Sequence, residues 1–133
     1  EPCRRLGLSN MKIPPKVIPR PYTRLAFEGW YFACEKGLGD EYADKMYRSY
    51  FIDEKNIGEM DVLVELAVSI GLDEEEYRKV LETGRYSQVE KEAVQYSKTV
   101  LKPKSIPTIY VNGEKVELKE YTKEEMVDIL NRY

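Results

Sequence analysis

Two cysteines and the lack of histidine set the limits on what chemistry this chain can do. Cys3 lies beside Arg4 and Arg5 in a proline-rich segment, and Cys34 lies within a helical pattern. Without histidine, Ser–His and Cys–His catalysis are excluded, and two thiols do not make a four-ligand zinc site. Cys3 is the only candidate nucleophile, because nearby positive charge favours a thiolate, but it has no evident resolving partner. We expect Cys34 to be a small buried core residue.

Composition fits one domain of ordinary size and excludes several classes of partner. The 133 residues carry 21 Lys and Arg against 24 Asp and Glu, a net charge of −3. This balance gives no electrostatic footprint for nucleic acid. No apolar run approaches the roughly 20 residues of a membrane-spanning helix. The two cysteines can form one disulfide, but isolated thiols in a chain of this size favour a reducing compartment, so we predict a cytoplasmic protein. Because the chain begins with Glu1 rather than Met, we expect it to be a piece of a longer protein.

Helical periodicity dominates the middle of the chain. Apolar residues recur at three- and four-residue spacing, with capping residues and glycines at the ends of each run. The predicted helices cover residues 23–36, 40–51, 59–70, 73 to the break at 83–84, 87–101, and a last helix from 122. The acidic run 73–76 and the aromatic residues of the first two helices suggest sites. A structural role is favoured for both, because acidic residues complement a first helical turn and aromatic stripes usually face a core.

The same spacing predicts which side chains are buried. In the first helix, Trp30 and Cys34 belong to the predicted inward stripe together with Ala26 and Ala33. Gly29, within that helix, indicates close backbone packing, because glycine otherwise weakens a helix. In the helix predicted over 87–101, the expected inward residues are Val89, Ala93, Tyr96 and Val100.

Residues 104–118, K-S-I-P-T-I-Y-V-N-G-E-K-V-E-L, contain the strong β-sheet pattern of this sequence. Asn112-Gly113 is typical of a two-residue type I′ turn, in which both central residues need positive φ. Such a turn places Ile109 opposite Val116 and sorts the apolar and polar side chains onto separate faces. The sequence therefore predicts a hairpin with a fixed register.

Two questions about this hairpin stay open at the level of the residues. Pro107 opens the first strand either as a trans proline that blunts the strand end or as a cis proline kept for a purpose. A lone two-stranded hairpin is also marginal in water and leaves backbone groups at its edges. The helices, the arm, a second copy of the chain or a missing part of a parent protein must cover it, so a homodimer is one expectation.

The predicted order of elements gives three parts. Residues 1–22 form an extended proline-rich arm, residues 23–101 a helical domain, and residues 102–133 a β-β-α part. The predicted fold class is mainly α with a small β-hairpin, an α+β arrangement.

Five segments, in this order and spacing, also resemble a known family. They are Pro21-Tyr-Thr-Arg-Leu-Ala26, Tyr47-Arg-Ser-Tyr-Phe51, Asn56-Ile-Gly-Glu-Met-Asp-Val-Leu63, Ile70-Gly-Leu-Asp73 and Ser105-Ile-Pro-Thr-Ile-Tyr-Val-Asn-Gly113. From about residue 21 onward the chain resembles the DsbA-like thioredoxin superfamily, especially its FrnE-type and 2-hydroxychromene-2-carboxylate isomerase-like branch. The resemblance implies a thioredoxin fold in which a helical insertion separates a first half, carrying a C-x-x-C or serine-containing site, from a second half of two strands and a helix.

Measured against that pattern, the chain corresponds to the helical insertion and the second half of the thioredoxin fold. It contains no C-x-x-C, and Phe27 stands where family members often have histidine. The resemblance places Ile106, Pro107 and Thr108 in the cis-proline loop, where backbone groups pair with an extended substrate. It implies no catalytic residue here beyond the weak candidate Cys3, no metal, and no cofactor except a possible role for glutathione.

Three functions remain open on this basis. The first is the C-terminal portion of a DsbA-like thiol–disulfide oxidoreductase that acts on a peptide or protein thiol and is inactive alone. The second is a non-catalytic module that binds a peptide or a partner protein. The third is a remnant of a glutathione-dependent isomerase, although no serine is placed like the family's active-site serine.

Overall fold

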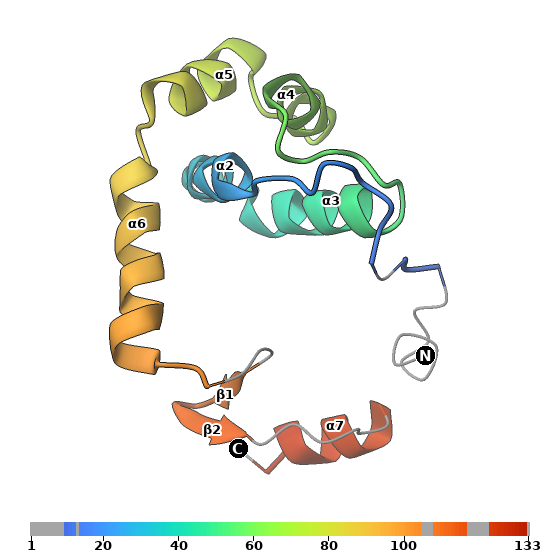
Figure 1. Ribbon diagram of the computed structural model, residues 1–133, viewed down its shortest axis with the longest axis vertical. Helices are drawn as coiled ribbons and strands as arrows, with labels where there is room; N and C mark the ends of the chain where they lie inside the picture. The colour runs from blue at the N-terminus through green and yellow to red at the C-terminus, as the bar shows by residue number, and fades with distance from the viewer. Residues whose placement is uncertain (1–9, 13, 105–107, 117–122, 133) are drawn as a thin grey trace. The chain divides into compact units, whose positions relative to one another are not determined.

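Helices make up most of the described chain, and one antiparallel hairpin lies directly before the last of them (Figure 1). The structure, a computed structural model, describes residues 10–12, 14–104, 108–116 and 123–132. The chain divides into two compact units. The helical unit comprises residues 12–95, and the C-terminal unit comprises the described residues of 1–11 and 96–133. The predicted fold class, mainly α with a small hairpin, is confirmed.

The helices begin and end close to the predicted points. They are α2 (Arg24–Glu35), α3 (Gly39–Phe51), α4 (Met60–Ser69), α5 (Glu74–Thr83), α6 (Ser87–Tyr96) and α7 (Lys123–Leu130). Asp73 caps α5, because its Oδ1 accepts the backbone N–H of Glu76 at 2.8 Å. The helix predicted over 87–101 changes type partway. After α6 a π-helical turn, η1, runs over Ser97–Leu101, and the N–H of Lys102 donates to the carbonyl of Ser97 at 2.9 Å.

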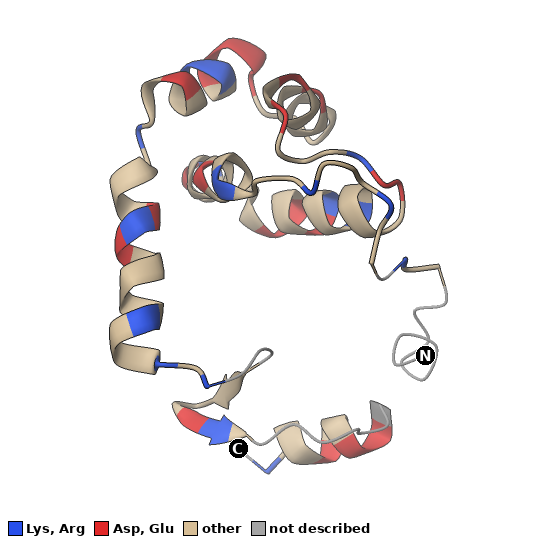
Figure 2. Ribbon diagram, in the orientation of Figure 1, with Lys and Arg blue, Asp and Glu red and all other residues tan. Residues whose placement is uncertain are grey.

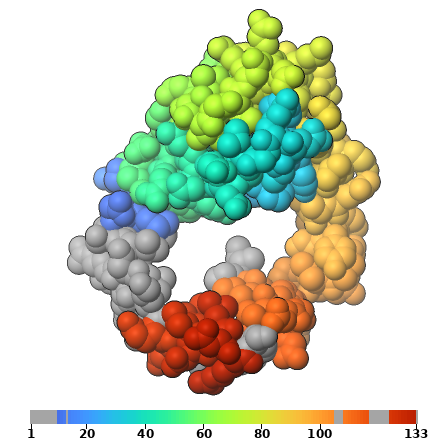
Figure 3. Space-filling view, turned by 180° about the vertical axis from the view of Figure 1, so that it is seen from behind, coloured from blue at the N-terminus to red at the C-terminus, as the bar shows by residue number. Residues whose placement is uncertain are grey.

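Two buried tyrosines lie in the core of the helical unit, where α2 packs against both α3 and α5. Figure 3 shows the surface of this unit, in blue to yellow-green, with its helices in close contact. The hydroxyls of Tyr42 and Tyr77, residues that are 1% and 0% exposed, lie 2.7 Å apart. Tyr42 donates to the carbonyl of Ala26 at 3.0 Å, so Tyr77 must be the donor to Tyr42. A Cβ at Gly29 would collide with both hydroxyls, so the predicted close packing at this glycine is confirmed.

Several side chains predicted to be buried lie at the surface instead. Trp30 is 38% exposed and Cys34 is exposed, although Ala26 and Ala33 of the same predicted stripe are buried. No residue of α6 is buried, which corrects the predicted inward face that included Val89 and Ala93. The physical reason is that helical spacing fixes which residues share a stripe but not how wide the covering surface is.

The described part of the proline-rich arm is held to the end of α3. The N–H of Lys12 donates to the carbonyl of Phe51 at 2.9 Å, and its Nζ lies 2.7 Å from the Glu54 carboxylate. Glu54 also accepts the N–H of Lys16 at 2.7 Å. Hydrogen bonds from Lys12 and then Lys16 lower the pKa of Glu54. Val17 is buried, and the peptide bond between Ile18 and Pro19 is cis.

The hairpin has the predicted register. Strands β1 (Ile109–Val111) and β2 (Glu114–Val116) pair antiparallel, with Ile109 opposite Val116 and Tyr110 opposite Lys115. Asn112 and Gly113 have φ values of 49° and 84°, as a type I′ turn requires. Val116 is buried and Ile109 is half-buried, so the apolar side of the hairpin is the covered one.

Candidate functional site

The proline loop is the first candidate site, and the structure describes one end of it. Thr108 is half-buried directly before β1, whereas Ile106, Pro107 and the candidate nucleophile Cys3 lie outside the described residues. The hydroxyl of Tyr110 donates to the carbonyl of Leu101 at 3.2 Å. This bond ties β1 to the last residue of η1. Residue spacing does not indicate this contact, because a tyrosine in a strand does not reveal its hydroxyl's partner.

Cys34 is the cysteine that the structure describes, and its surroundings do not activate it. Its side chain is exposed, but the sulfur packs so closely on Gly39, at the start of α3, that a Cβ there would lie 2.6 Å from Sγ. Partial withdrawal from water, and then the negative charge of Asp40, raise the pKa of the Cys34 thiol. A thiol with a raised pKa is mostly protonated at neutral pH and is a poor nucleophile.

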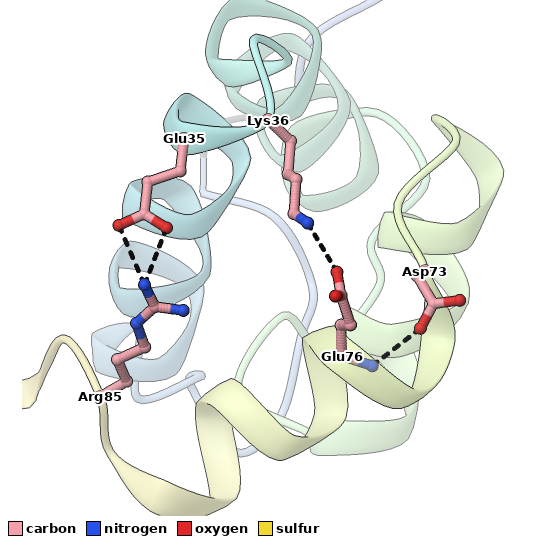
Figure 4. A network of polar contacts seen from close by, with 5 residues as sticks. All are labelled: Glu35, Lys36, Asp73, Glu76 and Arg85. Carbon is pink, nitrogen blue, oxygen red and sulfur yellow. Dashed lines mark hydrogen bonds and ion pairs between the residues drawn. The ribbon is translucent and has the colours of Figure 1, made fainter.

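The acidic run that begins α5 has the structural role favoured from the sequence. Asp73 caps the helix, and Glu76 forms an ion pair with Lys36 at 2.7 Å (Figure 4). Within the described ranges, no group of three or more His, Cys, Asp or Glu residues is placed to hold a metal ion.

A cleft beside these residues is a candidate that the sequence did not reveal. Its volume is about 480 Å³, and side chains of α2 and α5 line it with Arg85, which follows α5. The lining residues are Phe32, Glu35, Lys36, Glu76, Lys79, Val80, Thr83 and Arg85. The sequence did indicate that the four lining residues of α5 share one helical face, because they recur at three- and four-residue spacing. Nothing in the sequence placed that face opposite the end of α2.

Four of the charged side chains at the cleft form two ion pairs (Figure 4). Lys36 pairs with Glu76, and Arg85 donates to both carboxylate oxygens of Glu35 at 3.1 and 3.4 Å. Figure 2 shows acidic and basic residues interspersed along these helices. The arrangement offers charged groups for binding but no activated nucleophile.

Comparison with known proteins identifies the family. A model of the DSBA-like thioredoxin domain matches residues 10–124. The chain belongs to the DSBA-like thioredoxin domain family. This is a family of the thiol–disulfide oxidoreductase type, and the superfamily inferred from the sequence is therefore confirmed.

A curated protein is similar in sequence to much of this chain. The uncharacterized protein YwbO of Bacillus subtilis (strain 168) is 37% identical over 97 residues, which are 73% of this chain and 48% of that protein. The chain thus spans about half the length of the curated relative that it matches. Among the described residues of this family member, no helix has both the length and the apolar character needed to cross a membrane.

Proposed function

We propose that this chain is the C-terminal portion of a FrnE-type DsbA-like thiol–disulfide oxidoreductase. In this proposal it supplies the helical insertion and the proline loop that binds a peptide or protein thiol substrate. The nucleophile belongs to a C-x-x-C half outside these 133 residues. The chain alone then has little redox activity.

The state of the cysteines carries this proposal. A family of the thiol–disulfide oxidoreductase type needs a thiolate that its surroundings stabilise. This member has no C-x-x-C, and Cys34 has a raised pKa with Asp40 beside it. Cys3 stays a candidate from the sequence alone. Family membership without a C-x-x-C pair, and with a Cys34 that is not activated, supports a role in substrate binding and positioning rather than in the chemical step.

The geometry of the hairpin supports the binding role. A substrate strand that joins a loop by backbone hydrogen bonds requires the loop to be held in place. β1 is fixed in register by β2 on one side, and Tyr110 fixes it to the end of η1. Thr108 therefore lies at the start of a positioned strand, as the proposed role of residues 106–108 requires.

An insulin-reduction assay tests the proposal directly. We expect the 133-residue chain to reduce insulin no faster than the reductant alone, and we expect a Cys3→Ser/Cys34→Ser double variant to behave the same. A C-x-x-C oxidoreductase in a parallel reaction shows that the assay works. Robust turnover that the single substitution Cys3→Ser abolishes would show that Cys3 is a nucleophile and would overturn the proposal.

One observation favours a second candidate, a non-catalytic module that binds a peptide or a partner chain. In the described part of the chain, the sheet contains only β1 and β2, so each strand has one described strand neighbour. A peptide or a second copy of the chain can add to such a sheet by β-augmentation. Saturable binding of an extended cysteine-free peptide, with no thiol chemistry, favours this module, and light scattering detects the homodimer. Calorimetry with glutathione separates both from the isomerase-like alternative.

A further inference from the structure

The cleft between α2 and α5 has the size of a small-ligand site and a mostly charged lining. Its volume of about 480 Å³ falls within the roughly 300–1,000 Å³ of known small-molecule pockets. Phe32 and Val80, both buried core residues, give it an apolar part. Three cations and two carboxylates line the rest. In a chain with a net charge of −3, this local excess of positive charge favours an anion.

The cations at the cleft differ in how firmly they are engaged. Lys36 is held at 2.7 Å by Glu76, a short charge-assisted bond. Arg85 uses one nitrogen for both oxygens of Glu35, at 3.1 and 3.4 Å, which is long for such a bond. Lys79 has no ion pair or side-chain hydrogen bond with any residue that the structure describes. Lys79 and Arg85 are therefore the cations available to a ligand.

Tyr86 makes a second contact with Arg85, whose guanidinium carbon lies 5.2 Å from the centroid of the tyrosine ring. Its hydroxyl is buried and has no partner at hydrogen-bonding geometry. Burial and the nearby Glu35 carboxylate raise the pKa of Tyr86 to about 12, so the hydroxyl stays protonated at neutral pH.

We propose that this cleft binds a small organic acid, with a ligand carboxylate held by Lys79 and Arg85 and the carbon skeleton beside Phe32 and Val80. The guanidinium of Arg85 matches a carboxylate or a phosphate in shape. The apolar side of the cleft favours an organic acid over an inorganic anion, because inorganic phosphate has no apolar surface to bury there. The site does not depend on the redox role proposed above.

Calorimetric titration of the whole chain with succinate tests the site, with the neutral succinamide as the matched probe. We expect saturable binding of succinate and none of succinamide. Lys79→Met keeps the length of the side chain but removes the charge, and it should weaken succinate binding about tenfold. Lys91→Met, at an exposed lysine of α6 outside the cleft, removes the same charge and should leave binding unchanged.

A third variant changes affinity in the opposite direction. Glu35→Gln removes the carboxylate that competes for Arg85, so it should bind succinate several-fold more tightly. The proposal is overturned if succinate shows no saturable binding, or if Lys79→Met and Lys91→Met weaken it equally. Tighter binding of inorganic phosphate than of succinate would also overturn it, because the site would then select compact anions. Circular dichroism confirms that each variant is folded.

Discussion

The helical unit and the C-terminal unit differ in how their apolar side chains are covered. The helical unit has a continuous core around Tyr42 and Tyr77, to which α2, α3, α4 and α5 all contribute. Among the described residues after Tyr96, Val116 is the buried hydrophobic side chain. Two strands of three residues cannot bury enough surface to be stable alone. The helical unit can therefore supply its own stability, whereas the hairpin needs further cover, as the proposed missing half of the fold would provide.

The largest expected change in stability comes from truncating a buried side chain in the core of the helical unit. Leu63 is fully buried in α4, so Leu63→Ala should lower the free energy of unfolding by about 2–5 kcal/mol. Val116→Ala, in the hairpin, should leave this transition nearly unchanged, because local opening of the hairpin does not require the helices to unfold. Urea unfolding followed by the fluorescence of Trp30, the one tryptophan, measures both. Equal shifts from the two variants would show that the two units unfold as one.

Alkaline pH should weaken the helical unit through its tyrosine pair. Burial raises the pKa of Tyr77 to about 12, and burial first, then Tyr77, raises the pKa of Tyr42 further. An unfolded tyrosine titrates near pH 10. Above about pH 10 the unfolded state therefore loses protons that the folded state keeps, and stability falls as pH rises toward about 12.

The loss attributable to Tyr77 should be on the order of 2 kcal/mol across that range. Urea unfolding at about pH 9 and about pH 11 spans half of this range and should show about 1 kcal/mol of the loss. Tyr77→Phe should show a shallower decline, and Tyr47→Phe, at an exposed tyrosine of α3, should follow the parent chain. A parent chain whose stability does not change between these pH values contradicts the assignment.

The smallest expected effect is at the start of α5. Asp73→Ala removes the acceptor for the Glu76 N–H and should cost about 1 kcal/mol in the helical unit. Asp73→Asn keeps a capping oxygen and should be close to neutral. The same urea titration distinguishes them. If alanine and asparagine destabilise the unit equally, the loss comes from the charge of Asp73 rather than from its hydrogen bond.

Local interactions explain which predictions succeeded. Asn112-Gly113 requires a type I′ turn whatever surrounds it, so the pairing of Ile109 with Val116 followed from the residues alone. Asp73 caps its helix through a contact three residues away, which the sequence displays directly. Cys34 was predicted to be buried and is exposed, because its stripe is wider than the surface that covers α2. The cleft was missed because Glu35 and Arg85 are 50 residues apart.

The sequence by itself determined the limits of most helices, the hairpin register and the absence of histidine and C-x-x-C chemistry, since these depend on neighbours within a few residues or on composition. Only the tertiary structure decided that the Cys34 sulfur packs on Gly39 and that Arg85 reaches Glu35 loosely beside an unpaired Tyr86 hydroxyl. These features arise where helices meet. Their energies depend on distances and on exclusion of water, and residue spacing along one chain segment does not encode either.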